Sequence, residues 1–175
     1  MIDHIETQAE TDRKWLRYAY DVAGDLSTDP STQNAAVLVD MEHLPGGFVL
    51  LAAANCFPRG VQETPERWER PLKYSYVEHA ERNAIYAAAY QGVETRGLTM
   101  YVPWFACSEC ARAIIQAGIS EVVGHKAIFD RTMARWKDTI TVAHGMLTEA
   151  GVKFRMVDGE IGGFPVRFDG QLWQP

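Results

Sequence analysis

The sequence has few cysteines, no excess of positive charge and no long apolar segment. Three cysteines among 175 residues cannot build the disulfide framework of a small secreted domain. Lysine and arginine total 17 against 23 aspartates and glutamates, so no basic face is predicted for polymeric nucleic acid. No apolar run approaches the roughly 20 residues that cross a bilayer, and residues 1–13 lack the apolar segment of a signal peptide. We therefore expect a cytoplasmic protein without a membrane partner that acts on a small molecule.

The composition fits one domain with a substantial core, because 47% of the residues are hydrophobic. A helix from Thr7 or Thr11 to Gly24 is followed by alternating strand and helix patterns. Strands are predicted at 35–39, 48–54, 98–102, 121–124 and 152–157, and helices at 77–91, 108–117 and 137–150. The first two strands look buried on both faces.

This alternation predicts an α/β fold, a three-layer α/β/α arrangement around a central mixed five-stranded sheet. The whole chain, 1–175, is expected to be one domain with a catalytic core at about 11–157. Residues 158–175 are expected to form a C-terminal tail with a turn at Asp169-Gly170.

Two stretches carry the residues for a metal site. Residues 78–84 read Glu-His-Ala-Glu-Arg-Asn-Ala, and residues 106–110 read Ala-Cys-Ser-Glu-Cys. His79, Cys107 and Cys110 offer one nitrogen and two sulfur donors, which suits Zn²⁺ and leaves a fourth tetrahedral position for water. Glu81 lies two residues beyond the histidine, where its carboxylate could move protons to and from that water. His-x-Glu followed by Cys-x-x-Cys is the signature of the zinc-dependent nucleobase deaminases.

Each part of this pattern is weak evidence by itself. A histidine near a helix start is usually a cap or a core residue, and an isolated Cys-x-x-Cys is often only a redox pair. A zinc-stabilised regulatory module without turnover would use the same three ligands, but it would need no carboxylate placed like Glu81. The joint spacing of the four residues therefore favours a catalytic zinc.

Four stretches of the chain resemble the deoxycytidylate (dCMP) deaminases of the cytidine deaminase superfamily. They are residues 29–33 (Asp-Pro-Ser-Thr-Gln), 55–60 (Asn-Cys-Phe-Pro-Arg-Gly), 73–85 and 107–119. The resemblance implies that His79, Cys107 and Cys110 hold zinc, that Glu81 is the proton shuttle, and that dCMP is hydrolysed to dUMP and ammonia in pyrimidine nucleotide metabolism. It also implies a homo-oligomer, a dimer or a hexamer, and possible regulation by dCTP and dTTP.

The resemblance further implies substrate contacts from Asn55, Phe57 and the backbone amide of Ala80. The candidate phosphate ligands are arginines in two loops expected to overhang the pocket, 55–73 and 126–137, because a guanidinium pairs with phosphate through two hydrogen bonds. From these loops we select Arg59, Arg131 and Arg135. Arg67, Arg70 and Lys73 share the first loop, and a solvated charge is the default reading for any single one of the six.

The sequence departs from the family's pattern in three places. Ala106 stands where a proline usually precedes the first zinc cysteine, Cys56 replaces a glycine, and Asn34-Ala35 replaces Val-Gly. The last two departures bear on regulation by dCTP and dTTP more than on the chemistry. The substrate could also be another cytosine nucleotide or nucleoside (dCTP, a 5-substituted dCMP, cytidine) or an adenosine in tRNA, although the acidic composition fits the last poorly.

Overall fold

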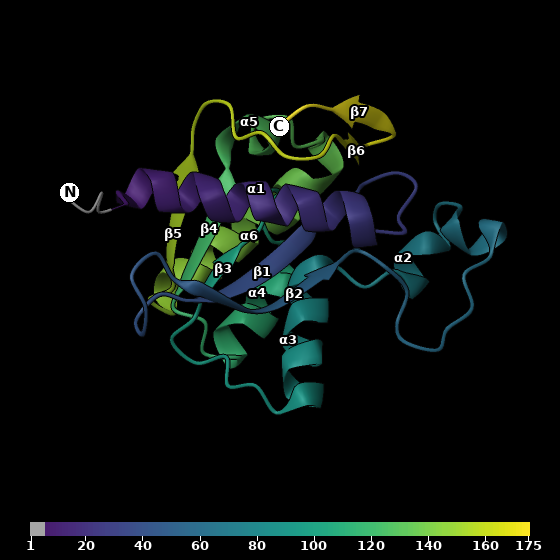
Figure 1. Ribbon diagram of the computed structural model, residues 1–175. Helices are drawn as coiled ribbons and strands as arrows, with labels where there is room; N and C mark the ends of the chain where they lie inside the picture. Colours follow the sequence, from purple (N-terminus) through teal and green to yellow (C-terminus); the bar gives the residue numbers. More distant parts are fainter. Residues whose placement is uncertain (1–5) are drawn as a thin grey trace.

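Five strands form one mixed sheet in the order β2-β1-β3-β4-β5 in the computed structural model, which describes residues 6–175 (Figure 1). The strands are β1 (Ala35–Asp40), β2 (Phe48–Ala54), β3 (Thr99–Tyr101), β4 (Glu121–His125) and β5 (Lys153–Val157). β1 pairs antiparallel with β2 and β3, whereas β3, β4 and β5 run parallel. The predicted α/β fold and its mixed five-stranded sheet are confirmed.

Side chains of the interior strand β1 point alternately into the two layers on either side of the sheet. Val37 and Val39 pack with α1 (Gln8–Leu26) on one face. Leu38 packs on the other face, which is covered by α3 (Ala80–Gln91), α4 (Ser108–Gln116) and α6 (Ala134–Glu149). The period of two follows from the pleat of a strand. Both faces of β1 are therefore covered, as an uninterrupted apolar run predicts.

The expectation that both early strands are buried on two faces is wrong for β2. This strand lies at the edge of the sheet, and most of its residues are only half-buried. The apolar run of β2 includes three alanines at 52–54. Such a short run can occur in an edge strand or in an interior strand, so the sequence pattern could not distinguish the two.

Helix α1 is capped by Thr7, not by Thr11. The Thr7 hydroxyl accepts a hydrogen bond from the Glu10 amide, and the Glu10 carboxylate accepts one from the Thr7 amide over 2.8 Å. This reciprocal pair satisfies two amides that the first turn leaves free. Within residues 6–175, no helix has both the length and the apolar character that crossing a membrane requires.

The segment around His79 differs from the helix predicted over 77–91. A short α2 (Lys73–Tyr76) comes first, and α3 begins only at Ala80. Between them Glu78 pairs in an isolated antiparallel bridge with Cys56, which holds the chain extended. His79 is consequently the N-cap residue of α3, at the point where the chain turns from the bridge into the helix.

The two loops named in the sequence analysis also contain helical turns. A short 3₁₀ helix (Pro65–Trp68) interrupts the loop after β2. The second loop, 126–137, contains α5 (Lys126–Phe129) and the start of α6 (Ala134–Glu149). Arg135 and Trp136 therefore belong to the first turn of α6, and not to a loop.

The C-terminal residues form a hairpin of β6 (Val166–Phe168) and β7 (Gln171–Trp173) with the predicted turn at Asp169-Gly170. Both turn residues have positive φ, 51° and 81°, as a type I′ hairpin turn requires. Val166 is buried against the layer of α1, so the hairpin packs on the domain.

Candidate metal centre and active site

Three donor atoms converge where the N-termini of α3 and α4 meet. His79 Nδ1 lies 3.6 Å from Cys107 Sγ and 3.5 Å from Cys110 Sγ, and the two sulfurs are 3.6 Å apart. A tetrahedral zinc with bonds of about 2.3 Å to sulfur and about 2.0–2.1 Å to nitrogen separates such donors by about 3.5–3.8 Å. The triangle therefore fits a single Zn²⁺, and all three donors belong to one candidate metal cluster.

Neighbouring side chains hold the two ligand-bearing helices in place. Arg82 in the first turn of α3 pairs with Glu78, beside the zinc histidine, and with Glu109, between the two cysteines. The Ser108 amide donates to Thr139 Oγ1 of α6 over 3.0 Å, which satisfies a free amide in the first turn of α4. The ligands are thus fixed by three helices that pack together.

The charges of the ligand side chains are coupled. The hydrogen bond between Cys107 and Cys110 lowers the pKa of Cys107 well below the usual value for a thiol, and the same contact raises the pKa of Cys110. Burial disfavours a charge on His79, but the hydrogen bond with Cys107 raises its pKa overall. One thiol of the pair therefore ionises readily, as binding a metal requires.

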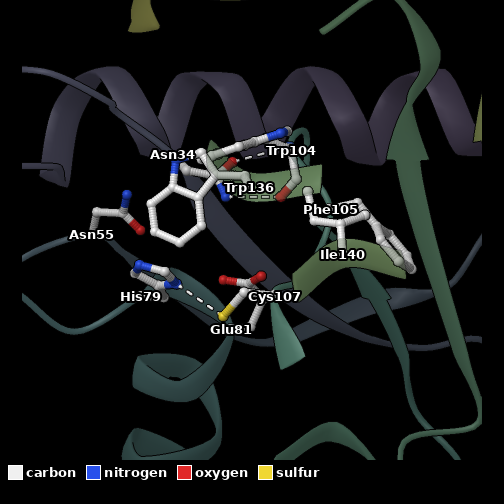
Figure 2. Close-up of a pocket in the computed structure, with 9 residues that line it drawn as sticks. All are labelled: Asn34, Asn55, His79, Glu81, Trp104, Phe105, Cys107, Trp136 and Ile140. Carbon is white, nitrogen blue, oxygen red and sulfur yellow. Dashed lines mark hydrogen bonds between the residues drawn. The ribbon is translucent and has the colours of Figure 1, made fainter. Parts of the chain in front are cut away.

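Glu81 is almost completely buried, 2% exposed, and lines the same pocket as His79 and Cys107 (Figure 2). Burial raises the pKa of Glu81 to about 7, because a carboxylate loses its hydration in such a site. A carboxyl group in this range can both accept and release a proton at neutral pH.

Aromatic side chains form the opposite wall of the pocket (Figure 2). The Trp104 and Trp136 rings meet edge to face with centroids 5.8 Å apart, and Trp136 lies 6.0 Å from the His79 ring. Asn34 fixes Trp104 through two hydrogen bonds, donating from Nδ2 to its carbonyl and accepting from its amide at Oδ1. The remaining walls are Asn55, Phe105 and Ile140.

Comparison with known proteins identifies the family. The sequence model of the cytidine and deoxycytidylate deaminase zinc-binding region matches residues 9–126. This chain belongs to that family. An uncharacterized deaminase from the luxG 3′ region of Aliivibrio fischeri is 35% identical over 144 residues, 80% of this chain and 91% of that protein. Human deoxycytidylate deaminase is 34% identical over 165 residues, 89% of this chain and 86% of that protein.

A solved structure supports the fold of this deaminase. The dCMP deaminase of cyanophage S-TIM5, in complex with dCMP and dUMP, superposes with a TM-score of 0.60. The match covers 86% of this chain and 98% of that chain at 20% sequence identity. At this identity, the comparison is evidence for the shared architecture alone.

Two of the predicted substrate-binding residues, Asn55 and Ala80, are hydrogen-bonded to each other, and Asn55 lines the deaminase pocket while Ala80 is buried behind it. Asn55 Oδ1 accepts a hydrogen bond of 2.9 Å from the Ala80 amide, and Asn55 Nδ2 donates to the Thr32 carbonyl over 2.9 Å. The amide group of Asn55 is thereby oriented beside His79, and its second Nδ2 hydrogen is not used by these contacts.

The other four predicted contacts lie in different places. Phe57 stacks between Trp68 and Tyr76, with centroids 4.2 and 5.4 Å away, and lines a different hollow from the zinc pocket. Arg59 lies over the Tyr90 ring on the α3 side of that same hollow.

The two selected arginines of the second loop, Arg131 and Arg135, also lie in different places. Arg131 lies over Trp173 of the C-terminal hairpin. Arg135 alone of the three selected arginines lines a hollow shared with His79. The pattern of basic residues could not distinguish these positions, and it gave no sign that Asn34, Trp104 and Trp136 build the pocket wall.

Proposed function

We propose that this deaminase hydrolyses dCMP to dUMP and ammonia. The observation that carries the proposal is the donor triangle of His79, Cys107 and Cys110, which fits zinc, with the buried carboxyl of Glu81 beside it in one pocket. The family membership and the similarity to human deoxycytidylate deaminase support the choice of a cytosine nucleotide.

Zinc, when held by these three residues, supplies the acidity that makes a water molecule a nucleophile near neutral pH. We assign the proton transfers to Glu81. It accepts a proton from the water and passes it to N3 of the cytosine ring, then takes a second proton from the hydroxyl group formed at C4 and delivers it to the 4-amino group. A C4–O bond forms, the C4–N bond breaks, and ammonia leaves. The burial of Glu81 keeps bulk water from competing for these protons.

Recognition of the base or sugar is assigned to Asn55. Its side chain cannot turn freely, because the Ala80 amide and the Thr32 carbonyl hold both of its ends. A pre-oriented amide binds a polar group of the nucleoside without a large loss of side-chain entropy. Trp104 and Trp136 offer aromatic surfaces to the planar base.

We assign the preference for a nucleotide over a nucleoside to a contact with the phosphate. Of Arg59, Arg131 and Arg135, only Arg135 lines a hollow together with His79, so we propose that it contacts the phosphate. A charge-assisted contact is worth about 1.5–3 kcal/mol, so removing the phosphate from the substrate should cost about 10- to 150-fold in kcat/KM. Arg135→Ala should lose activity on dCMP, while Arg59→Ala and Arg131→Ala serve as matched controls.

The substrate is tested by offering dCMP, dCTP, deoxycytidine, CMP and adenosine in tRNA separately to the zinc-loaded protein. Ammonia release should be fastest with dCMP. If another compound is turned over faster, that compound is the substrate and the proposal of dCMP is wrong. If none is turned over, the protein is a zinc-binding module without catalytic activity.

We also propose that the protein is a homo-oligomer. The exposed Tyr86 and Tyr90 of α3 lie beside the exposed Leu26 at the end of α1, and all three line one hollow. Grouped exposed apolar side chains are typical of interfaces between subunits. Light scattering should give at least twice the mass of one chain, and the mass of a single chain would contradict the proposal.

Regulation by dCTP and dTTP is assigned to the same hollow, which lies apart from the zinc pocket and carries Arg59, Glu78 and Cys56. The Cys56 thiol accepts a hydrogen bond from Asn83 over 3.3 Å and fills space that a glycine would leave open. Turnover of dCMP measured with added dCTP or dTTP, in wild type and Cys56→Gly, tests the assignment.

We place the protein in the cytoplasm, since a site with two thiolates suits a reducing compartment.

A further inference from the structure

Two arginines from distant parts of the chain share one carboxylate. Arg70 lies just before α2, and Arg135 lies in the first turn of α6. Both donate to the same oxygen, Oδ1 of Asp169, over 3.0 Å and 2.5 Å respectively. Asp169 belongs to the turn of the β6-β7 hairpin, beyond the residues 9–126 that the family's sequence model matches.

The two arginines stand beside the zinc pocket. They line a hollow whose other walls include Asn55, His79, Trp104 and Trp136. The same four residues line the zinc pocket itself. A group attached to a base that lies at His79 can therefore extend towards the two guanidinium groups.

The hairpin that carries Asp169 is held against this hollow. The Gln33 amide donates to the Arg167 carbonyl over 2.8 Å, and the Gly170 amide donates to the Ser31 carbonyl over 2.8 Å. Phe168 packs edge to face on Trp104 with centroids 5.0 Å apart. The Asp169 carboxylate is thus placed between the two arginines by the fold of the hairpin.

The two positive charges in this cluster suit an anion with more negative charge than a single carboxylate. Two guanidinium groups face one carboxylate whose pKa is lowered by Arg135, so the carboxylate is charged at neutral pH. The side chains are partly exposed, at 43% for Arg70, 40% for Arg135 and 33% for Asp169, and ion pairs of this kind exchange readily. A phosphate dianion would match both positive charges and both donor geometries.

We propose that Asp169 is an internal competitor of the substrate's phosphate: its carboxylate occupies the place between Arg70 and Arg135 that the 5′-phosphate takes when a nucleotide binds. This inference rests on the proposed function, because it assigns the phosphate subsite of that reaction. A nucleotide must displace Asp169 and a nucleoside need not, so the contact lowers the preference for nucleotides over nucleosides.

The decisive variant is Asp169→Asn, which removes the charge and keeps the size of the side chain. Asparagine also tolerates the left-handed backbone of this position, where φ is 51°. Glu160→Gln removes one negative charge from an exposed residue of the same C-terminal segment and is the matched control. The melting temperatures of both variants are compared with wild type to verify folding.

The first readout is the ratio of kcat/KM for dCMP to kcat/KM for deoxycytidine. Relief of two partly exposed ion pairs should raise this ratio about 2- to 30-fold in Asp169→Asn and leave it unchanged in Glu160→Gln. A ratio that stays the same or falls in Asp169→Asn, or that rises equally in both variants, overturns the proposal.

The second readout is calorimetric titration of the zinc-loaded protein with inorganic phosphate, which needs no turnover. Asp169→Asn should bind phosphate about 2- to 30-fold more tightly than wild type, and Arg70→Gln/Arg135→Gln should bind it more weakly. If these shifts occur in a protein that does not deaminate dCMP, the proposed function fails and the anion subsite stands. Equal phosphate affinity in wild type, Asp169→Asn and Glu160→Gln overturns the subsite itself.

Discussion

Lys73→Met should destabilise the protein strongly, because it breaks a buried ion pair. Lys73 Nζ lies 2.7 Å from the carboxylate oxygens of Asp29, and the two side chains are only 6% and 2% exposed. Asp29 also accepts hydrogen bonds from the amides of Ser31 and Thr32 over 2.8 and 3.0 Å. The substitution leaves a carboxylate without its counter-charge at the turn whose Thr32 carbonyl orients Asn55.

Removing one partner of a buried pair typically costs about 3–5 kcal/mol. The two amide hydrogen bonds that remain on Asp29 favour the lower end, about 3 kcal/mol of unfolding free energy. For a chain of this length, about 2–4 °C is lost per kcal/mol, so the melting temperature should fall by about 6–12 °C. The assay is urea unfolding of the zinc-loaded protein at one fixed zinc concentration, since bound metal adds to the apparent stability.

Two further variants make this prediction sharp. Lys126→Met breaks an exposed pair with Asp130 and should cost no more than about 1 kcal/mol. Asp29→Asn/Lys73→Met contains no uncompensated charge, and its amide oxygen can still accept the two amide hydrogen bonds, so it should recover part of the loss. The reasoning is refuted if Lys73→Met costs less than about 1 kcal/mol, or if the double variant is less stable than Lys73→Met.

Three other outcomes are expected at the metal centre. Glu81→Gln should keep zinc but lose about 10²- to 10⁴-fold in kcat, since a positioned acid–base group contributes that much; more than a tenth of wild-type kcat would contradict the role. The protein should hold about one zinc per chain by elemental analysis, lose activity on chelation, and regain it with one equivalent of zinc. Arg82→Met should weaken zinc binding about 10- to 100-fold in a chelator competition, because Arg82 joins the helices that carry the ligands; unchanged affinity would show that those ion pairs do not position them.

The zinc site was predictable because its residues lie in two short stretches of regular local structure. His79 and Glu81 begin one helix, and Cys107 and Cys110 begin another. Only one contact between the two helix starts has to be inferred to bring the donors together. The alternation of strand and helix patterns predicted the sheet and its layers for the same reason, since each pattern is local.

The pocket wall and the arginine pair were not predictable in this way. Trp136 and Arg135 lie in the first turn of α6, which the polar composition of residues 126–136 concealed. Arg70, Arg135 and Asp169 meet only because the C-terminal hairpin docks on the turn at 31–33. Such contacts join residues that are 34 and 99 positions apart, and a single sequence carries no periodic signal for them.

The most direct test of the proposed reaction is to incubate the zinc-loaded protein with dCMP in isotopically labelled water and to analyse both products. Hydrolysis predicts equal amounts of dUMP and ammonia, with one labelled oxygen at C4 of the new base, and almost no product from Glu81→Gln. Unchanged dCMP, or dUMP without the label at C4, would contradict the account.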